Sequence, residues 1–220
     1  MTPERFALVQ QKLALRQPDL TVLLEQVHKS HNFSAILRSC DAVGVFEANV
    51  VPPEGGTPLS NHTAQGAEKW VQVRRFPAME SAQDQLRSEG FQLLAAHLDH
   101  RAVDYRDVDY TRPTAVVLGA ERDGVSEETL ERCDATIFIP MQGMVQSLNV
   151  SVACALILFE AQRQRMASGH YESRRLTGPR YDKTRFEWLH PTIARYCRQK
   201  GRRYPPLDEN GELLEHPVKT

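Results

Sequence analysis

The fold of this 220-residue chain is indicated most clearly by Ile137–Ala155, IFIPMQGMVQSLNVSVACA. A short apolar run ends at Pro140, which cannot continue a hydrogen-bonded strand. A glycine-containing loop follows. Ser147, a residue type that favours helix N-termini, then predicts a long helix that continues to about Arg165. Strand, loop and helix N-terminus in this order are typical of α/β proteins that bind a ligand at the carboxyl edge of the sheet.

The rest of the chain alternates short apolar runs with helical patterns. Continuous apolar runs are typical of strands buried on both sides, so we predict an α/β fold, a mostly parallel sheet with helices on both faces. The expected strands cover residues 20–24, 48–51, 71–73, 91–96, 114–118 and 137–139. Four of the expected helices run from Thr2 to before Pro18, from the caps Asn32 and Ser34 to Ala42, from Met79 to Glu89, and from Ser147 to about Arg165. A further short helix is expected to start at Ser126. Residues 52–70, rich in Gly, Pro and small polar residues, are expected to form a long loop.

Composition and cysteine spacing exclude several classes of protein. Hydrophobic content of 41% and charged content of 25% are ordinary for a globular protein. No apolar run is long enough for a membrane span, and the first residues lack the apolar core of a signal peptide, so we expect a cytoplasmic protein without membrane contact. The cysteines, at positions 40, 133, 154 and 197, form no C-x-x-C pair, so neither a metal site nor a disulfide framework is expected.

The net charge of −1 conceals an uneven distribution of charge. Between Arg163 and Arg203 the sequence has twelve basic and three acidic residues, with aromatic residues interleaved. Such a run is typical of a solvated helical tail, and it also suits phosphate contacts and stacking on RNA bases. The candidate RNA-binding residues are Arg163, Arg165, Arg174, Arg175, Arg202 and Arg203.

Three polar segments stand where the expected strands end. The first holds Asn32, Ser34 and Arg38 on one predicted helix, and an arginine on so apolar a helix needs an anionic partner. That partner is either a ligand phosphate or a structural carboxylate such as Asp41 or Glu25. The second segment is LGAERDG, residues 118–124, whose glycines allow close approach of the backbone to a ligand. The third carries Ser147 and Asn149 at the expected helix N-terminus.

Several common catalytic motifs are absent from the sequence. No G-x-G-x-x-G follows a strand, which argues against the glycine-rich type of dinucleotide or adenosylmethionine site. No G-x-x-x-x-G-K-[ST] phosphate loop is present, and no G-x-S-x-G places Ser147 in a hydrolase triad.

The three polar segments together resemble the SPOUT superfamily of RNA methyltransferases. The similar motifs are HNFSAILRSCDAVGV, LGAERDGVS and IPMQGMVQSLNVSVACALILFEAQRQR, and the resemblance is much weaker after Arg165. It implies a deep trefoil knot at the C-terminal end of the sheet, with helical N- and C-terminal extensions. The implied division is residues 1–18, a methyltransferase domain at 19–167, and a basic extension at 168–220.

The resemblance also implies a cofactor and a reaction. S-adenosylmethionine is expected to bind in the knot, mostly through backbone groups, and the implied contacts are Ala96, Gly119, Ile139, Met144 and Leu148. Ala96 departs from the threonine common in close relatives, which removes a hydroxyl contact but no backbone bond. The implied reaction is methylation of the ribose 2′-hydroxyl of the D-loop guanosine of tRNA. The same transfer to ribosomal RNA or to a wobble nucleotide is an alternative, and so is a non-catalytic RNA-binding module.

The implied catalytic residues are Arg38, Asn32, Glu121, Ser147 and Asn149. An arginine holds its proton far above neutral pH, so we expect Arg38 to clamp a phosphate and stabilise the developing alkoxide, with the role of general base left open. The family is homodimeric, which implies that Arg38 reaches toward the cofactor of the partner subunit and that helix 147–165 packs across the two-fold axis.

Overall fold

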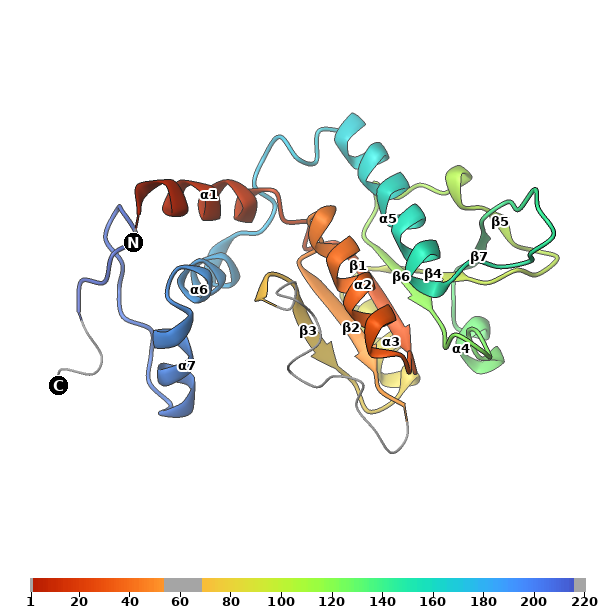
Figure 1. Ribbon diagram of the computed structural model, residues 1–220, viewed down its shortest axis with the longest axis horizontal. Helices are drawn as coiled ribbons and strands as arrows, with labels where there is room; N and C mark the ends of the chain where they lie inside the picture. Colours follow the sequence, from red (N-terminus) through yellow and green to blue (C-terminus); the bar gives the residue numbers. More distant parts are fainter. Residues whose placement is uncertain (1, 54–68, 216–220) are drawn as a thin grey trace. The chain divides into compact units, whose positions relative to one another are not determined.

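The computed structural model describes residues 2–53 and 69–215 (Figure 1). Most of the expected loop at 52–70 lies outside these residues. The described chain divides into two compact units. Gln17–His170 form the first, called here the sheet unit, and the two ends of the chain, up to Arg16 and from Tyr171, form the second, called the terminal unit. The N-terminal helix and the C-terminal residues, which the sequence analysis treats as separate extensions, thus belong to one unit.

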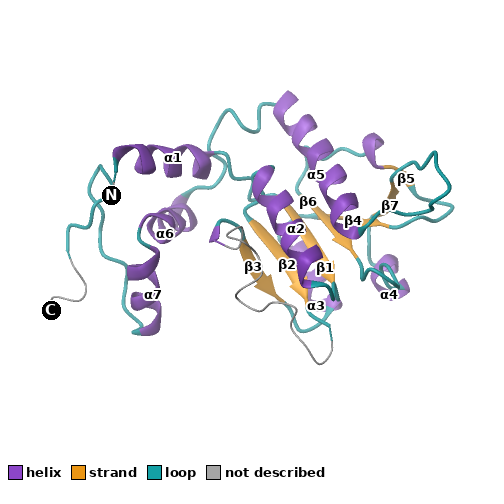
Figure 2. Cartoon of the chain, viewed as in Figure 1, coloured by secondary structure: helices purple, strands orange, loops and turns teal. Residues whose placement is uncertain are grey.

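Seven parallel strands form the sheet within the described residues, in the order β3-β2-β1-β6-β4-β7-β5 (Figure 2). The strands are β1 (Leu20–Glu25), β2 (Glu47–Val51), β3 (Gln72–Arg75), β4 (Gln92–Ala96), β5 (Val103–Asp104), β6 (Thr114–Leu118) and β7 (Ala135–Phe138). The expected α/β class and parallel sheet are therefore confirmed. The strand expected at 137–139 begins two residues earlier and ends at Phe138.

Helices cover both faces of the sheet, as expected. One face packs against α2 (Ser30–Ala42) and α5 (Val150–Ala167), which lie side by side in Figure 1. The opposite face packs against α3 (Met79–Ser88) and α4 (Glu127–Glu131). Residues 22 and 24 of β1 point to the first face and Leu23 to the second, which explains why the central strands are apolar throughout.

Chain order reverses at the centre of the sheet. Strands β2 and β3 follow β1 on one side of it. Strand β4 lies on the other side of β1, and β6 occupies the position between β1 and β4. Such a reversal leaves a crevice beyond the carboxyl ends of the two central strands, where α/β proteins bind ligands. The carboxyl ends of β1 and β6, at Glu25 and Leu118, are therefore the place to look for a site.

Two expected helix starts are wrong by a few residues. The helix expected to begin at the caps Asn32 and Ser34 begins at Ser30, so both residues lie inside α2. The helix expected to begin at Ser147 begins at Val150, and its cap is Asn149, whose Oδ1 accepts the N–H of Ser151 at 2.8 Å. Helix α5 thus uses Asn149, one of the capping side chains that the sequence offered, whereas α2 begins after Lys29 without a side-chain cap.

The terminal unit is built from α1 (Pro3–Ala14), α6 (Gly178–Leu189) and α7 (Pro191–Gln199). The Oγ1 of Thr2 accepts the N–H of Arg5 and so caps α1, the helix that the sequence predicts there. The last residues fold back on these helices at Gly211, whose φ is +75°. A side chain at Gly211 would come within 2.5 Å of the Phe6 ring, so only glycine fits.

None of the helices in the described residues is long and apolar enough to span a membrane.

Candidate active site

Three of the five expected catalytic residues form one hydrogen-bonded chain at the carboxyl edge of the sheet. The Nδ2 of Asn149 donates to the Oδ1 of Asn32 at 3.1 Å. The Nδ2 of Asn32 then donates to Glu121 Oε1 at 2.7 Å. These residues come from the start of α5, the first turn of α2 and the loop after β6, so the network joins all three polar segments that the sequence indicated.

The backbone after β1 also holds the carboxylate of Glu121. Its two oxygens accept the N–H groups of His28 at 3.3 Å and of Lys29 at 3.1 Å. Burial alone would raise the pKa of this carboxyl group, but the hydrogen bonds from the Asn32 side chain and from nearby backbone N–H groups outweigh burial and lower the pKa. A carboxyl group with a lowered pKa stabilises the fold above its unfolded pKa, and this stabilisation is lost as the pH falls through the folded pKa. Glu121 is therefore ionised at neutral pH.

A second carboxylate, Glu25, fixes the other end of the loop after β6. Glu25 is only 7% exposed at the end of β1, and it accepts bonds from the N–H and the Oγ–H of Ser126 at 3.0 and 2.6 Å. It also accepts the hydroxyl of Thr129 at 2.9 Å. The loop is thus attached to the end of β1 at both Glu121 and Ser126. The sequence suggested Glu25 only as a partner for Arg38. The signal for its different role was a charged residue at the end of a strand that is buried along its whole length.

Arg38 is exposed on α2 and forms no hydrogen bond or ion pair with any described residue. Glu25, one of the two carboxylates considered as a structural partner, binds Ser126 and Thr129 instead. No ion pair joins Arg38 to Asp41 either. Of the two interpretations left open by the sequence, the structural ion pair is therefore wrong, and the guanidinium is available to an external anion.

The remaining expected catalytic residue, Ser147, lies in the exposed loop before α5 and makes no hydrogen bond with the described residues. Met144, expected to contact the cofactor, is 99% exposed, whereas Met141 in the same loop is half-buried.

Three of the expected cofactor contacts lie at the ends of neighbouring strands. Ala96 ends β4, Gly119 follows β6 directly, and Ile139 follows β7 directly. The strand order β6-β4-β7 places them side by side along the carboxyl edge. Leu148 is half-buried just before α5. The structure therefore brings these four residues to the same edge as Asn32, which their sequence separation alone could not establish.

Arg165, expected to contact RNA, is fully buried and bonded through all five of its N–H groups. Nε donates to the carbonyl of Tyr110, and Nη1 donates to Gln17 Oε1 and to Asp19 Oδ1, the latter at 2.7 Å. Nη2 donates to the carbonyls of Asp19 and Arg112. A guanidinium has five N–H donors, so none remains for a phosphate. The assignment of Arg165 to RNA binding is wrong, because this residue attaches the end of α5 to the sheet.

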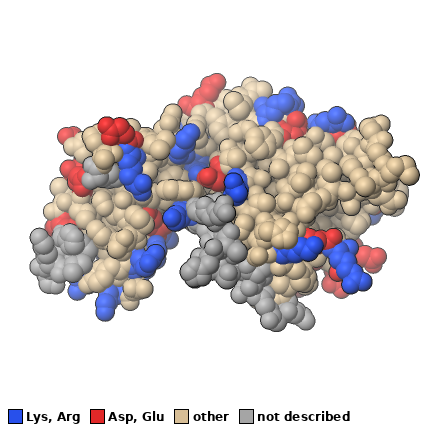
Figure 3. Space-filling view, in the orientation of Figure 1, with Lys and Arg blue, Asp and Glu red and all other residues tan. Residues whose placement is uncertain are grey.

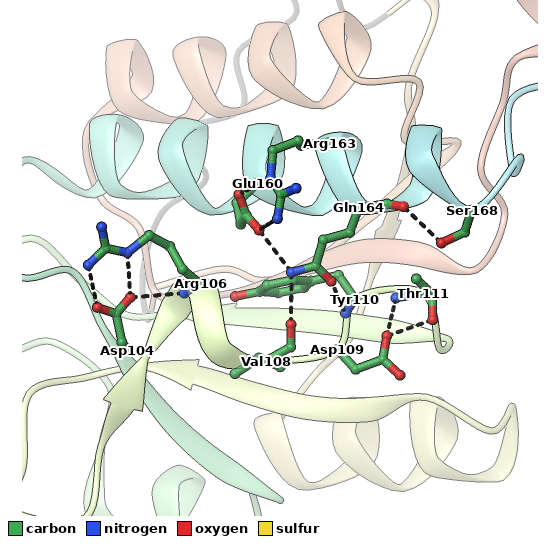
Figure 4. A network of polar contacts seen from close by, with 10 residues as sticks. All are labelled: Asp104, Arg106, Val108, Asp109, Tyr110, Thr111, Glu160, Arg163, Gln164 and Ser168. Atoms are coloured by element: carbon green, nitrogen blue, oxygen red, sulfur yellow. Dashed lines mark hydrogen bonds and ion pairs between the residues drawn. The ribbon is translucent and has the colours of Figure 1, made fainter.

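Arg163, two residues earlier on α5, is exposed and forms a bidentate ion pair with Glu160, at 2.8 and 2.7 Å (Figure 4). Gln164 beside it donates to the carbonyl of Val108 and accepts the N–H of Tyr110. This face of α5 thus has both an exposed arginine and a set of bonds to the 97–113 connection.

The aromatic residues of the terminal unit are buried or half-buried, and several of them pack within the unit. Tyr181, Phe186 and Trp188 lie in its core, and Phe186 stacks on Tyr204 with ring centroids 4.5 Å apart. The guanidinium of Arg174 lies 4.1 Å from the centre of the Tyr181 ring. Arg202 and Arg203 are exposed, and Arg175 is half-buried. Figure 3 shows basic side chains over both units with acidic ones close to many of them.

No group of three or more His, Cys, Asp or Glu side chains in residues 2–53 and 69–215 is arranged to hold a metal ion.

Comparison with known proteins gives a family for this arrangement. Residues 19–159 match the SpoU rRNA Methylase family, and residues 163–216 match the C-terminal region described as SpoU, rRNA methylase, C-terminal. The chain belongs to the SpoU methylase family. The matched region contains Asn32, Arg38, Glu121 and Asn149, and the resemblance to SPOUT RNA methyltransferases drawn from the sequence is confirmed.

Similar proteins extend the match over most of the chain. A relative from Thermus thermophilus, named tRNA (guanosine(18)-2′-O)-methyltransferase, is 55% identical over 86% of this chain and 97% of its own length. The crystal structure of A. aeolicus TrmH/SpoU tRNA modifying enzyme has a TM-score of 0.80 and 40% identity, covering 86% of this chain and 97% of that one. The SpoU methyltransferase AviRb from Streptomyces viridochromogenes, solved in complex with the cofactor AdoMet, has a TM-score of 0.62 and 29% identity, covering 71% and 64%.

The carboxyl edge in this SpoU-family chain fits such a cofactor. SpoU methyltransferases use S-adenosylmethionine. The edge offers backbone groups at three adjacent strand ends beside the partly buried apolar side chains of Ala96 and Ile139. The loop after β6 closes tightly on itself, because a side chain at Gly119 would lie 1.9 Å from the backbone of Gly124. Gly119 is therefore required by the loop itself, a different reason from the ligand approach that the sequence suggested.

Proposed function

We propose that this chain methylates the ribose 2′-hydroxyl of guanosine 18 in the D-loop of tRNA, with S-adenosylmethionine as methyl donor. The observation that carries the proposal is the Asn149–Asn32–Glu121 network at the carboxyl edge. Its Asn32 lies on the same helix as Arg38, which forms no hydrogen bond or ion pair with the described residues. The substrate follows from relatives of this chain, such as the Thermus thermophilus protein, whose name specifies that nucleotide.

The residues of the site have distinct parts in the proposed reaction. When bound, S-adenosylmethionine supplies a methyl group on a positively charged sulfur. As the ribose hydroxyl takes the methyl group, its proton passes through an oxygen of an RNA phosphate to water, so negative charge develops on the ribose oxygen in the transition state. Arg38 stabilises this charge and holds the adjacent phosphate, because its guanidinium forms no hydrogen bond or ion pair with the described residues. Glu121, through Asn32, fixes the Asn149 amide at the start of α5, and Ser147 and Asn149 orient the nucleotide. Ala96, Gly119, Ile139, Met144 and Leu148 hold the cofactor.

Methyl transfer to unmodified tRNA transcript tests this function directly. With labelled S-adenosylmethionine and nucleotide mapping, we expect one 2′-O-methyl group per tRNA, on the D-loop guanosine. Label on a wobble nucleotide, or on ribosomal RNA alone, would support 2′-O-methyl transfer but contradict the assignment of the D-loop guanosine as its substrate. Cofactor binding without transfer to any RNA would identify a non-catalytic RNA-binding module.

We also propose that the chain forms a deep trefoil knot at the C-terminal end of the sheet. Contacts between α5 and the 97–113 connection support it. Gln164 bonds Val108 and Tyr110, and Arg165 bonds Tyr110 and Arg112, so the connection lies along the helix that would pass beneath it. The proposed domain limits remain residues 1–18, 19–167 and 168–220. The proposed RNA contacts are Arg163, Arg174, Arg175, Arg202 and Arg203.

The proposed active form is a homodimer in which α5 packs against its copy. An apolar stripe along α5 supports this arrangement. Val152, Leu156, Phe159 and Met166 follow helical spacing on this helix and are 46, 39, 51 and 60% exposed. Large apolar side chains aligned on one helix mark a contact surface, and a two-fold axis would place the same stripe on both partners.

Leu156→Asp is expected to convert a dimer into monomers, because the two-fold axis would place two buried carboxylates close together. We expect association to weaken by at least about a hundredfold, measured by sedimentation equilibrium. The matched control is Leu8→Asp on α1, where the leucine is 53% exposed and lies outside the stripe. A variant that keeps the dimer mass would contradict the assignment of α5 to the interface.

A further inference from the structure

The carboxyl edge of the sheet unit has a group of basic side chains around Glu121. We call it the edge cluster: His28, Lys29 and His31 from the segment between β1 and the first turn of α2, and Arg122 from the loop after β6. All four side chains are exposed. None of them belongs to the basic C-terminal region that the sequence analysis assigned to RNA.

Glu121 holds the two halves of the edge cluster together. Its Oε2 accepts the N–H of His28 and its Oε1 accepts the N–H of Lys29, so this segment is fixed against the loop that carries Arg122. Arg122 is the next residue in the chain. The backbone of Lys29 is thus bonded to the carboxylate of Glu121, the residue that precedes Arg122. The same carboxylate accepts the Asn32 amide, so both basic residues lie next to the Asn32 network.

The charges of the edge cluster are not neutralised within the described protein. The donors to the Glu121 carboxylate are two backbone N–H groups and the Asn32 amide, and none is a side chain of the edge cluster. The side chains of His28, Lys29, His31 and Arg122 form no hydrogen bond or ion pair with described residues. Asp123, adjacent to Arg122, forms none with it. Lys29 and Arg122 therefore keep their full capacity to bind an anion.

We propose that Lys29 and Arg122 bind the RNA phosphates on either side of the nucleotide that enters the site, with His28 and His31 as additional donors. The inference rests on the proposed function and extends it, because it assigns recognition of the RNA backbone to residues at the carboxyl edge that the proposed function does not use. A lysine and an arginine whose backbone positions are held together beside the site keep the RNA backbone close enough for one ribose to reach the Asn32 network.

The test compares Arg122→Ala, Lys29→Ala and the double variant with Arg112→Ala. Arg112 is an exposed arginine of the same unit that precedes β6, at the opposite edge of the sheet. Binding of unmodified tRNA transcript is measured at several KCl concentrations, and binding of S-adenosylhomocysteine by calorimetry. Each edge variant is expected to weaken RNA binding by about threefold to tenfold and to reduce the salt slope by about 0.7 to 1, since one phosphate contact is lost. Arg112→Ala is expected to bind tRNA with wild-type affinity and salt slope. All variants are expected to keep the wild-type affinity for S-adenosylhomocysteine.

Three results would overturn the proposal: unchanged RNA affinity and salt slope in the folded double variant, an equal loss in Arg112→Ala, or a loss confined to S-adenosylhomocysteine binding. The last would assign Arg122 to the cofactor. The proposal and the proposed function fail in different ways. If the wild-type protein transfers no methyl group to tRNA but the edge variants weaken RNA binding, the edge cluster still binds RNA and only the proposed reaction is overturned.

Discussion

Arg38→Ala is expected to lower kcat for ribose methylation by about 10²- to 10³-fold, which is the usual effect of removing one group that stabilises developing negative charge. The structure gives the reason. Arg38 is exposed on the same helix as Asn32 and forms no hydrogen bond or ion pair with the described residues, so its loss should leave the fold intact. Single-turnover methylation of tRNA transcript measures the chemical step, and S-adenosylhomocysteine binding should stay within about twofold of wild type.

Two further variants define what Arg38 contributes. Arg38→Lys keeps the charge but loses the planar pair of donors, so we expect a kcat between those of wild type and Arg38→Ala. Arg112→Ala, at the opposite edge of the sheet, controls for the loss of one positive charge. A change in KM alone, with kcat preserved in Arg38→Ala, would show that Arg38 only binds RNA and would remove its role in the transition state.

Arg165→Ala is expected to lower the free energy of unfolding by about 3–5 kcal/mol, the usual cost of removing one partner of a buried ion pair. The side chain of Arg165 is fully buried, and its loss removes an ion pair with Asp19 and the hydrogen bonds donated to the carbonyls of Tyr110, Asp19 and Arg112. Arg163→Ala, two residues earlier, removes an exposed arginine and is expected to change stability by no more than about 0.5 kcal/mol. Urea denaturation measures both.

RNA binding by the same pair of variants distinguishes the two roles. Under conditions in which both variants are folded, Arg163→Ala should weaken tRNA binding, whereas Arg165→Ala should retain wild-type affinity. The opposite pattern, a stable Arg165→Ala protein with reduced RNA affinity, would restore Arg165 to the RNA contacts that the sequence suggested.

Much of the fold could be predicted because it depends on local patterns. The apolar runs at 20–24, 92–96 and 114–118 are strands, and their lack of polar alternation correctly indicated a sheet covered on both faces. The spacing of Asn32, Glu121 and Asn149 at strand ends indicated one site, because the carboxyl ends of parallel strands meet at one edge. The resemblance to SPOUT enzymes then supplied the chemistry, which residue types alone had left open.

Features that depend on long-range contacts were decided only by the tertiary structure. Arg163 and Arg165 are equivalent in sequence, yet one is exposed and the other fully buried, because only the latter faces Asp19 and the Tyr110 carbonyl across the sheet unit. Glu25 ends an apolar strand, and no local pattern shows that Ser126, a hundred residues later, supplies its donors. The sequence therefore determined the elements and the edge where they meet, since these follow from neighbouring residues. Which charges are buried and bonded and which remain free for RNA was decided by contacts between distant segments.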